Sequence, residues 1–246
     1  MVFILPNLST KIQLFSAFTL AEVLITLSII GVVAALTIPA LMNNTQDKEL
    51  KTAWIKAYSV VDQAQRSMLE DAGGDLGTLN HSACSMDINV VKPIMENFAS
   101  YYKYSKISMP GNYDCGNLVG SMRQLYNLHW SLYPIKKPDG TIDTMTNWSG
   151  NGIALADGTF IFYTPTAGGA SFGQLGNRVY IIFVDVNGAK KPNMWGKDFF
   201  QINFAQRGIW AEGINTATRQ LAPCDSTNYS NCGAWILQDP NYKVPW

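Results

Sequence analysis

The residues with the most recognisable catalytic spacing are Gly169-Ala170-Ser171-Phe172-Gly173, which match the G-x-S-x-G pattern of a nucleophilic serine. A hydrolase of this kind needs a histidine after the serine, but the only histidines, His81 and His129, precede it. The Gly-rich flanks favour a loop over the strand-turn-helix that exposes such a serine. The sequence contains neither a P-loop nor a Gly-x-Gly-x-x-Gly motif. We therefore expect a protein that is not an enzyme.

A second set of residues could bind a metal ion. Asp185, Asn187 and Asp198 carry oxygen donors of the kind that Ca²⁺ prefers, and they lie near a turn. The segment lacks the alternating Asp/Asn pattern and the late bidentate Glu of an EF-hand, and Asp-x-Asn-Gly is also ordinary hairpin chemistry. The turn is our default interpretation, with no cofactor expected, and calcium is kept as an alternative. The two distant histidines argue against a His-based metal site.

The four cysteines are the remaining reactive side chains, and their even number suits an oxidising compartment. Four cysteines allow three pairings. We favour Cys84–Cys115 with Cys224–Cys232, because each of these pairs closes a local loop. Free buried thiols are the alternative.

Composition limits the classes of partner. The chain has 246 residues, and its 18 Lys and Arg balance its 18 Asp and Glu. Proteins that bind nucleic acid usually present a strongly basic face, so no nucleic-acid partner is expected. The length suffices for one sizeable domain in addition to a membrane helix.

One stretch dominates the N-terminal part of the sequence. Residues 18–42 contain a single charge, Glu22, and residues 23–42 contain no ionisable group. At ~1.5 Å per residue, a helix of that length spans ~30 Å, the thickness of the hydrocarbon core of a bilayer. The segment therefore predicts a membrane helix, or a helix that packs among copies of itself. An intramembrane carboxylate is a functional candidate, although Glu22 is near enough to the end to reach the headgroups.

The sequence around this carboxylate is Ser16-Ala17-Phe18-Thr19-Leu20-Ala21-Glu22-Val23-Leu24-Ile25. It resembles the processing site of type IV prepilins and type II secretion pseudopilins, in which Gly usually stands where this chain has Ala17. The resemblance implies that a prepilin peptidase removes the leader 1–17 by cutting between Ala17 and Phe18. It also implies that Phe18 is then N-methylated, that Glu22 supports assembly and that Pro39 bends the helix.

The same resemblance implies where the protein acts and with what. The chain would reside as a single-pass protein in the inner membrane and then enter a periplasmic or extracellular fibre. Its partners would be the prepilin peptidase, an inner-membrane assembly platform and other pilin or pseudopilin subunits. A different class of function remains as an alternative: an uncleaved, membrane-anchored extracytoplasmic module that binds a ligand.

The helix is expected to continue through 43–72 as an amphipathic segment. Pro39 should kink it, because the ring removes a hydrogen bond and crowds the preceding turn. Gly73-Gly74 should end it. The predicted buried face has steps of three and four residues and consists of Leu50, Trp54, Ala57, Val61, Ala64 and Met68. The predicted solvated face carries Lys48, Lys51, Lys56, Asp62, Gln65 and Arg66.

Residues 73–246 should form a globular α+β domain. A helix is predicted over 87–104. Two hairpins are predicted, the first around Asp157-Gly158 with strands at 153–155 and 160–163, the second with strands at 179–184 and 199–204. Together they make a four-stranded antiparallel sheet with one face to bury against the long helix. That arrangement is also the pilin-like roll that the N-terminal resemblance implies.

Overall fold

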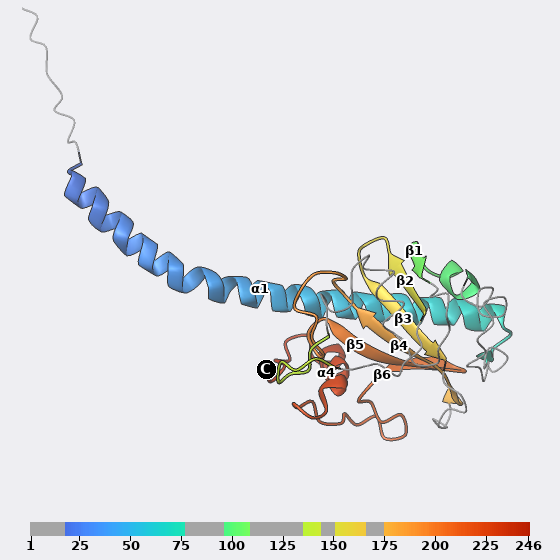
Figure 1. The fold of residues 1–246 in the computed structure, drawn as a ribbon. Coiled ribbons are helices and arrows are strands. Elements are labelled where there is room, and N and C mark those ends of the chain that lie inside the picture. The colour runs from blue at the N-terminus through green and yellow to red at the C-terminus, as the bar shows by residue number, and fades with distance from the viewer. Residues whose placement is uncertain (1–17, 77–95, 109–134, 144–150, 166–174) are drawn as a thin grey trace, which may run out of the picture. The chain divides into compact units, whose positions relative to one another are not determined.

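The computed structural model describes residues 18–76, 96–108, 135–143, 151–165 and 175–246. The chain divides into two compact units, with the boundary between Gln46 and Asp47 (Figure 1). A single helix, α1, contributes to both units and runs from Leu20 to Asp71. The C-terminal unit contains the sheet.

The helix α1 includes Pro39 and is helical on both sides of it. It ends where the sequence indicates. Gly73 and Gly74 both adopt positive φ angles, and the amide of Gly74 donates a hydrogen bond of 2.8 Å to the carbonyl of Leu69. Glycine adopts this left-handed conformation without a steric penalty, so the pair satisfies the last carbonyls of the helix.

The sheet is an antiparallel meander in which every strand pairs with its neighbour in sequence. The two predicted hairpins are confirmed as its centre. Figure 1 shows the strands β2 to β5 side by side, crossed by the part of α1 that belongs to the same unit. The strands are β1 (Tyr104–Ser108), β2 (Asn151–Leu155), β3 (Phe160–Pro165), β4 (Arg178–Asp185), β5 (Phe199–Ala205) and β6 (Gly208–Ala211).

Within the described residues, the sheet therefore has six strands rather than the four that were predicted. The additional strands are the two edges, β1 and β6, which have five and four residues. Edge strands are often short, and strands of that length give little alternation to detect in a sequence. The predicted helix over 87–104 also extends too far, since residues 96–100 are helical but Tyr104 begins β1. Residues 87–95 of that prediction lie outside the described part of the chain.

Both faces of the sheet are buried, whereas the sequence predicted one. The face toward α1 packs against the predicted helical face, and all six of its residues are buried, as expected. The strand side chains on this side are Ile153, Leu155, Ile161, Tyr180, Ile182, Val184, Phe200, Ile202 and Phe204. The opposite face forms a second core from Ile135, Ala154, Phe160, Phe162, Ile181, Phe183, Trp195 and Phe199.

Two residues of the predicted solvated face of α1 are buried instead. Lys51 is 6% exposed and forms an ion pair with Asp47, one turn earlier in the helix. Gln65 is 1% exposed and lies four residues after Val61, at the flank of the buried face. The rest of the domain therefore buries a wider face of α1 than its apolar residues indicate.

A short C-terminal helix, α4 (Cys232–Gln238), follows a single 3-10 turn, η4 (Tyr229–Asn231). The sequence analysis did not predict either. The predicted disulfide between Cys224 and Cys232 is present and joins the start of α4 to the preceding loop. A Cβ atom on Gly233 would lie 3.0 Å from the indole of Trp54, so glycine permits the close approach of α4 to α1.

Candidate functional site

The start of α1 carries the candidate functional residues. Phe18 is 85% exposed, and the helix begins two residues later. Thr19 occupies the N-cap position and Glu22 the third helical position. The backbone N–H of Thr19 donates to Oε2 of Glu22 at 2.9 Å, and its hydroxyl donates to the same oxygen at 2.7 Å. The N–H of Glu22 donates to the Thr19 hydroxyl at 3.2 Å, which completes a capping box.

The segment that follows is apolar and unpacked within the chain. Of the side chains described between residues 18 and 46, only Ala34 is half-buried and the others are exposed. A soluble monomer rarely exposes so large an apolar surface. Among the described residues, α1 is the one helix that is long and apolar enough to cross a membrane.

The polar side chains within this segment are satisfied locally. The hydroxyls of Thr26, Ser28 and Thr37 each donate to a backbone carbonyl one turn earlier, at 2.8 to 3.0 Å. Such bonds leave no hydroxyl donor without a partner in surroundings that offer no water. Glu22 is the only ionisable residue between Phe18 and Gln46.

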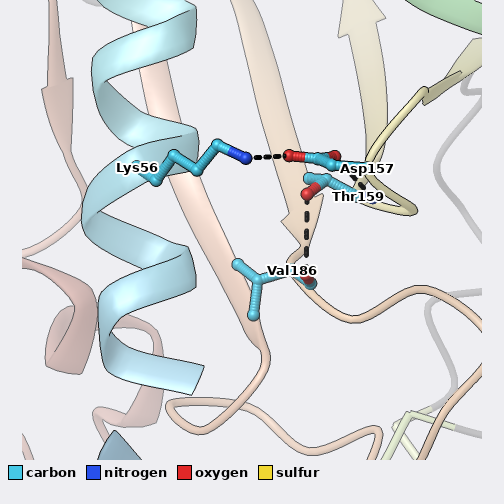
Figure 2. A network of polar contacts seen from close by, with 4 residues as sticks. All are labelled: Lys56, Asp157, Thr159 and Val186. Carbon is cyan, nitrogen blue, oxygen red and sulfur yellow. Dashed lines mark hydrogen bonds and ion pairs between the residues drawn. The ribbon is translucent and has the colours of Figure 1, made fainter. Parts of the chain in front are cut away.

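The C-terminal part of α1 is fixed to the sheet by polar contacts as well as by its apolar face. Nζ of Lys56 donates to Oδ2 of Asp157 in the β2–β3 turn at 2.6 Å, and Figure 2 shows the two side chains facing each other. Thr159 donates its N–H to Asp157 at 3.1 Å and its hydroxyl to the carbonyl of Val186 at 3.5 Å (Figure 2). Burial raises the pKa of Asp157, but the hydrogen bonds from Lys56 and Thr159 outweigh it and hold that pKa below its usual value.

The loop between β4 and β5 contains the residues considered for calcium. Asp185 and Asp198 are both buried. The two oxygens of Asp198 accept the backbone N–H groups of Asn193 and Met194, each at 2.6 Å. The N–H of Asn187 donates to Asp185 at 3.2 Å, as in an Asx turn. The described geometry thus gives these residues the turn role that was our default.

The same loop retains two oxygens that a cation could use. Oδ1 of Asn187 and Oδ1 of Asn193 are buried without a hydrogen-bond partner. Burial raises the pKa of Asp198 to about 6, against the opposing effect of its hydrogen bonds. In the described part of the chain, no group of three or more His, Cys, Asp or Glu side chains is placed to hold a metal ion.

Several predicted residues cannot be placed. The leader 1–17, including Ala17, lies outside the described residues, and so do Cys84, Cys115, Ser171 and the two histidines. Their predicted roles stay predictions. Within the described residues, the structure brings Phe18 and Glu22 to the same end of α1, and Pro39 lies inside that helix.

Thr19 is a residue of the site that was not predicted from the sequence. Its signal was present, because Thr19-Leu20-Ala21-Glu22 matches the [ST]-x-x-[DE] pattern that precedes an apolar helical run. Glu22 thus has a local role at the helix start in addition to the assembly role that the resemblance implies.

No family model, no curated protein and no solved structure matches this chain.

Proposed function

We propose that this protein is a structural subunit of a type IV pilus or a type II secretion pseudopilus. One observation carries the proposal: a single helix contains an exposed apolar segment with one carboxylate near its start, and further along it forms the buried spine of an α+β domain. An anchor alone would not need the carboxylate. A domain helix alone would not need the exposed apolar residues.

The physical argument begins with the exposed surface of residues 18–42. It is stable in a bilayer, and it is equally stable among apolar helices of other copies. Cleavage between Ala17 and Phe18 would create a cationic amine at Phe18. Glu22 of a neighbouring subunit would neutralise that amine. A buried ion pair of this kind specifies the axial register between subunits more than it adds stability.

The processing and the partners follow from this proposal. The prepilin peptidase would cut the precursor in the inner membrane, the amine of Phe18 would be methylated, and an assembly platform would move the subunit into the fibre. The globular domain would then lie in the periplasm or outside the cell. The subunit itself would catalyse no reaction.

The N-terminus of the mature protein tests the proposal. Mass spectrometry of protein purified from its own membrane should show a chain that begins at methylated Phe18. A mature protein that retains residues 1–17 would contradict the proposal and favour the membrane-anchored binding module instead.

A substitution tests the assembly role of the carboxylate. Glu22→Ala should leave membrane insertion intact, because removing a charge makes insertion easier. It should abolish incorporation into fibres. Fractionation of cells into membrane and sheared-fibre material measures both quantities. Normal incorporation of the variant would remove the assembly role from Glu22.

A further inference from the structure

We infer that Thr19 is a positioning residue for Glu22: it holds one carboxylate oxygen in the capping box and leaves the other for the neighbouring subunit. The inference rests on the proposed function, since the neighbour's amine is the group that would use the second oxygen. The inference assigns a role to Thr19 and gives the two oxygens of Glu22 separate roles.

The hydrogen bonds of the capping box involve only one of the two carboxylate oxygens of Glu22. Both donors of Thr19, its backbone N–H and its hydroxyl, bind Oε2 of Glu22. Within the described residues, no hydrogen bond reaches Oε1. Two donors on one oxygen fix the χ angles of Glu22, so the side chain is held close to the helix start instead of sampling the rotamers of an exposed glutamate. The free oxygen therefore has a defined position before any partner arrives.

The arrangement is compatible with processing. The proposed cleavage breaks the bond between Ala17 and Phe18, so the nitrogen of Thr19 remains a peptide N–H in the precursor and in the mature chain. The capping box can therefore exist before cleavage, after cleavage and in the fibre. The cationic amine forms at Phe18, one residue before Thr19, and supplies the group that the free oxygen of another subunit would bind.

Four variants separate the two oxygens. Thr19→Ser retains the hydroxyl, whereas Thr19→Val removes it with almost no change in size. Glu22→Gln retains an amide oxygen that can accept the cap, since Gln also occurs at this position of capping boxes, but it replaces the second oxygen with an NH₂ donor. Glu22→Ala removes both oxygens.

The cap is measured on the full-length protein in lipid nanodiscs, where no fibre is present. The rate of amide hydrogen exchange at Thr19 and Glu22 reports whether the helix start is closed. We expect exchange in Thr19→Val and Glu22→Ala to be faster by about fivefold or more. Thr19→Ser and Glu22→Gln should stay close to the unsubstituted protein. Unchanged exchange in Thr19→Val would overturn the inference.

Fibre incorporation supplies the second readout and separates this inference from the proposed function. Thr19→Val should lower incorporation and Thr19→Ser should restore it. Glu22→Gln should keep the protected amides yet lose incorporation, because its NH₂ group faces a cation. If Glu22→Ala assembles normally, the assembly role proposed for Glu22 fails whatever the exchange rates are. If Glu22→Ala fails to assemble and Thr19→Val assembles normally, the proposed function stands and the positioning role of Thr19 is wrong.

Discussion

Trp54 contacts both the sheet and the C-terminal helix from its place on α1. Its indole is fully buried, stacks on Phe200 of β5 with ring centroids 4.3 Å apart, and donates from Nε1 to the carbonyl of Gly233 at 2.9 Å. It therefore joins α1, the sheet and α4. An indole has both a large apolar surface and one N–H donor, and this site uses both.

Replacing Trp54 should separate those two contributions. Trp54→Ala leaves a cavity and should lower the free energy of unfolding by about 3–5 kcal/mol. Trp54→Phe keeps a ring against Phe200 but leaves the buried carbonyl of Gly233 without its donor, and should cost about 1–3 kcal/mol. Urea unfolding of the protein in detergent measures both. If the two variants are equally destabilised, packing against Phe200 contributes little and this account is wrong.

Asp198 should make the stability of the domain depend on pH. Burial raises its pKa in the folded protein to about 6, above the value near 4 of an unfolded chain. Between these values the folded state holds the proton more strongly, so this group contributes most stability below pH ~4 and loses that contribution as the pH rises through ~6. The free energy of unfolding of the natural protein, compared with that of Asp198→Asn, should therefore fall between pH 4 and 6 and then level off.

A metal ion would change that profile. If the loop is held by hydrogen bonds alone, as the bonds from Asn193 and Met194 suggest, neither calcium nor a chelator should alter the unfolding midpoint at pH 7. A midpoint that rises with calcium and saturates would contradict the turn interpretation. It would assign the site to Asp185, Asp198 and the two unpartnered asparagine oxygens.

At the residue scale, the sequence predicted apolar positions better than polar ones. Every residue of the predicted buried face of α1 is buried, because a period of 3.6 residues marks a helical face unambiguously. The prediction that Lys51 and Gln65 are exposed was wrong. A polar residue at the flank of the buried face is buried or exposed according to what packs beside it. A single sequence does not contain that information.

Among the elements, α4 and the loop before it depend on the disulfide. Cys224 and Cys232 are eight residues apart, and the helix that begins at Cys232 packs its Gly233 against Trp54. By restricting the unfolded chain, a bridge across so short a loop contributes about 2.5 kcal/mol. It thereby keeps α4 in the position where Gly233 accepts the Trp54 hydrogen bond.

Replacing both cysteines by alanine should lower the free energy of unfolding by about that amount and should expose Trp54 earlier in a urea titration. Because the chain has seven tryptophans, the fluorescence of Trp54 is taken as the difference from a chain that also carries Trp54→Phe. That difference can be compared with far-UV circular dichroism, which reports the whole fold. The substitution leaves Cys84 and Cys115 unchanged, so the experiment needs no reductant. A variant as stable as the natural protein would show that packing alone holds α4.

At the element scale, the sequence predicted the long helix and the two central hairpins. Asp157-Gly158 is a strong turn signal, and β3, β4 and β5 are rich in β-branched and aromatic residues. It did not predict β1, β6 or α4. These elements are only four to seven residues long, so local propensity alone gave no clear signal for them. In addition, β1 and α4 are stabilised by residues that are distant in the sequence, as in the pairing of Tyr104 with Leu155 and the approach of Gly233 to Trp54.

For the whole molecule, the division at Gln46 and Asp47 separates two physical tasks. The first buried apolar side chain in the described chain is Leu50, so the cores on both faces of the sheet are built from residues of the C-terminal unit. The described side chains of residues 18–46 are almost all exposed, and an apolar surface of this kind is one that a membrane or other helices would cover. The sequence predicted this division, because the character of the helix changes from wholly apolar to amphipathic.

A chain shortened to residues 47–246 should therefore fold without detergent, remain soluble and unfold cooperatively. It retains Leu50, Trp54 and the rest of the buried helical face, whereas the side chains that the structure describes in residues 18–46 are exposed, apart from the half-buried Ala34. A chain shortened to residues 58–246 is the control, because it also lacks Leu50, Trp54 and Ala57 of the buried helical face. The loss of the Trp54 side chain alone should lower the free energy of unfolding by about 3–5 kcal/mol. Thermal unfolding followed by circular dichroism should give one transition for the first chain and none, or one at far lower temperature, for the second. If the longer chain aggregates or lacks a transition, residues 18–46 support the domain directly. The apolar segment would then belong to the fold of the single subunit, and its proposed availability to a membrane and to other subunits would lose its basis.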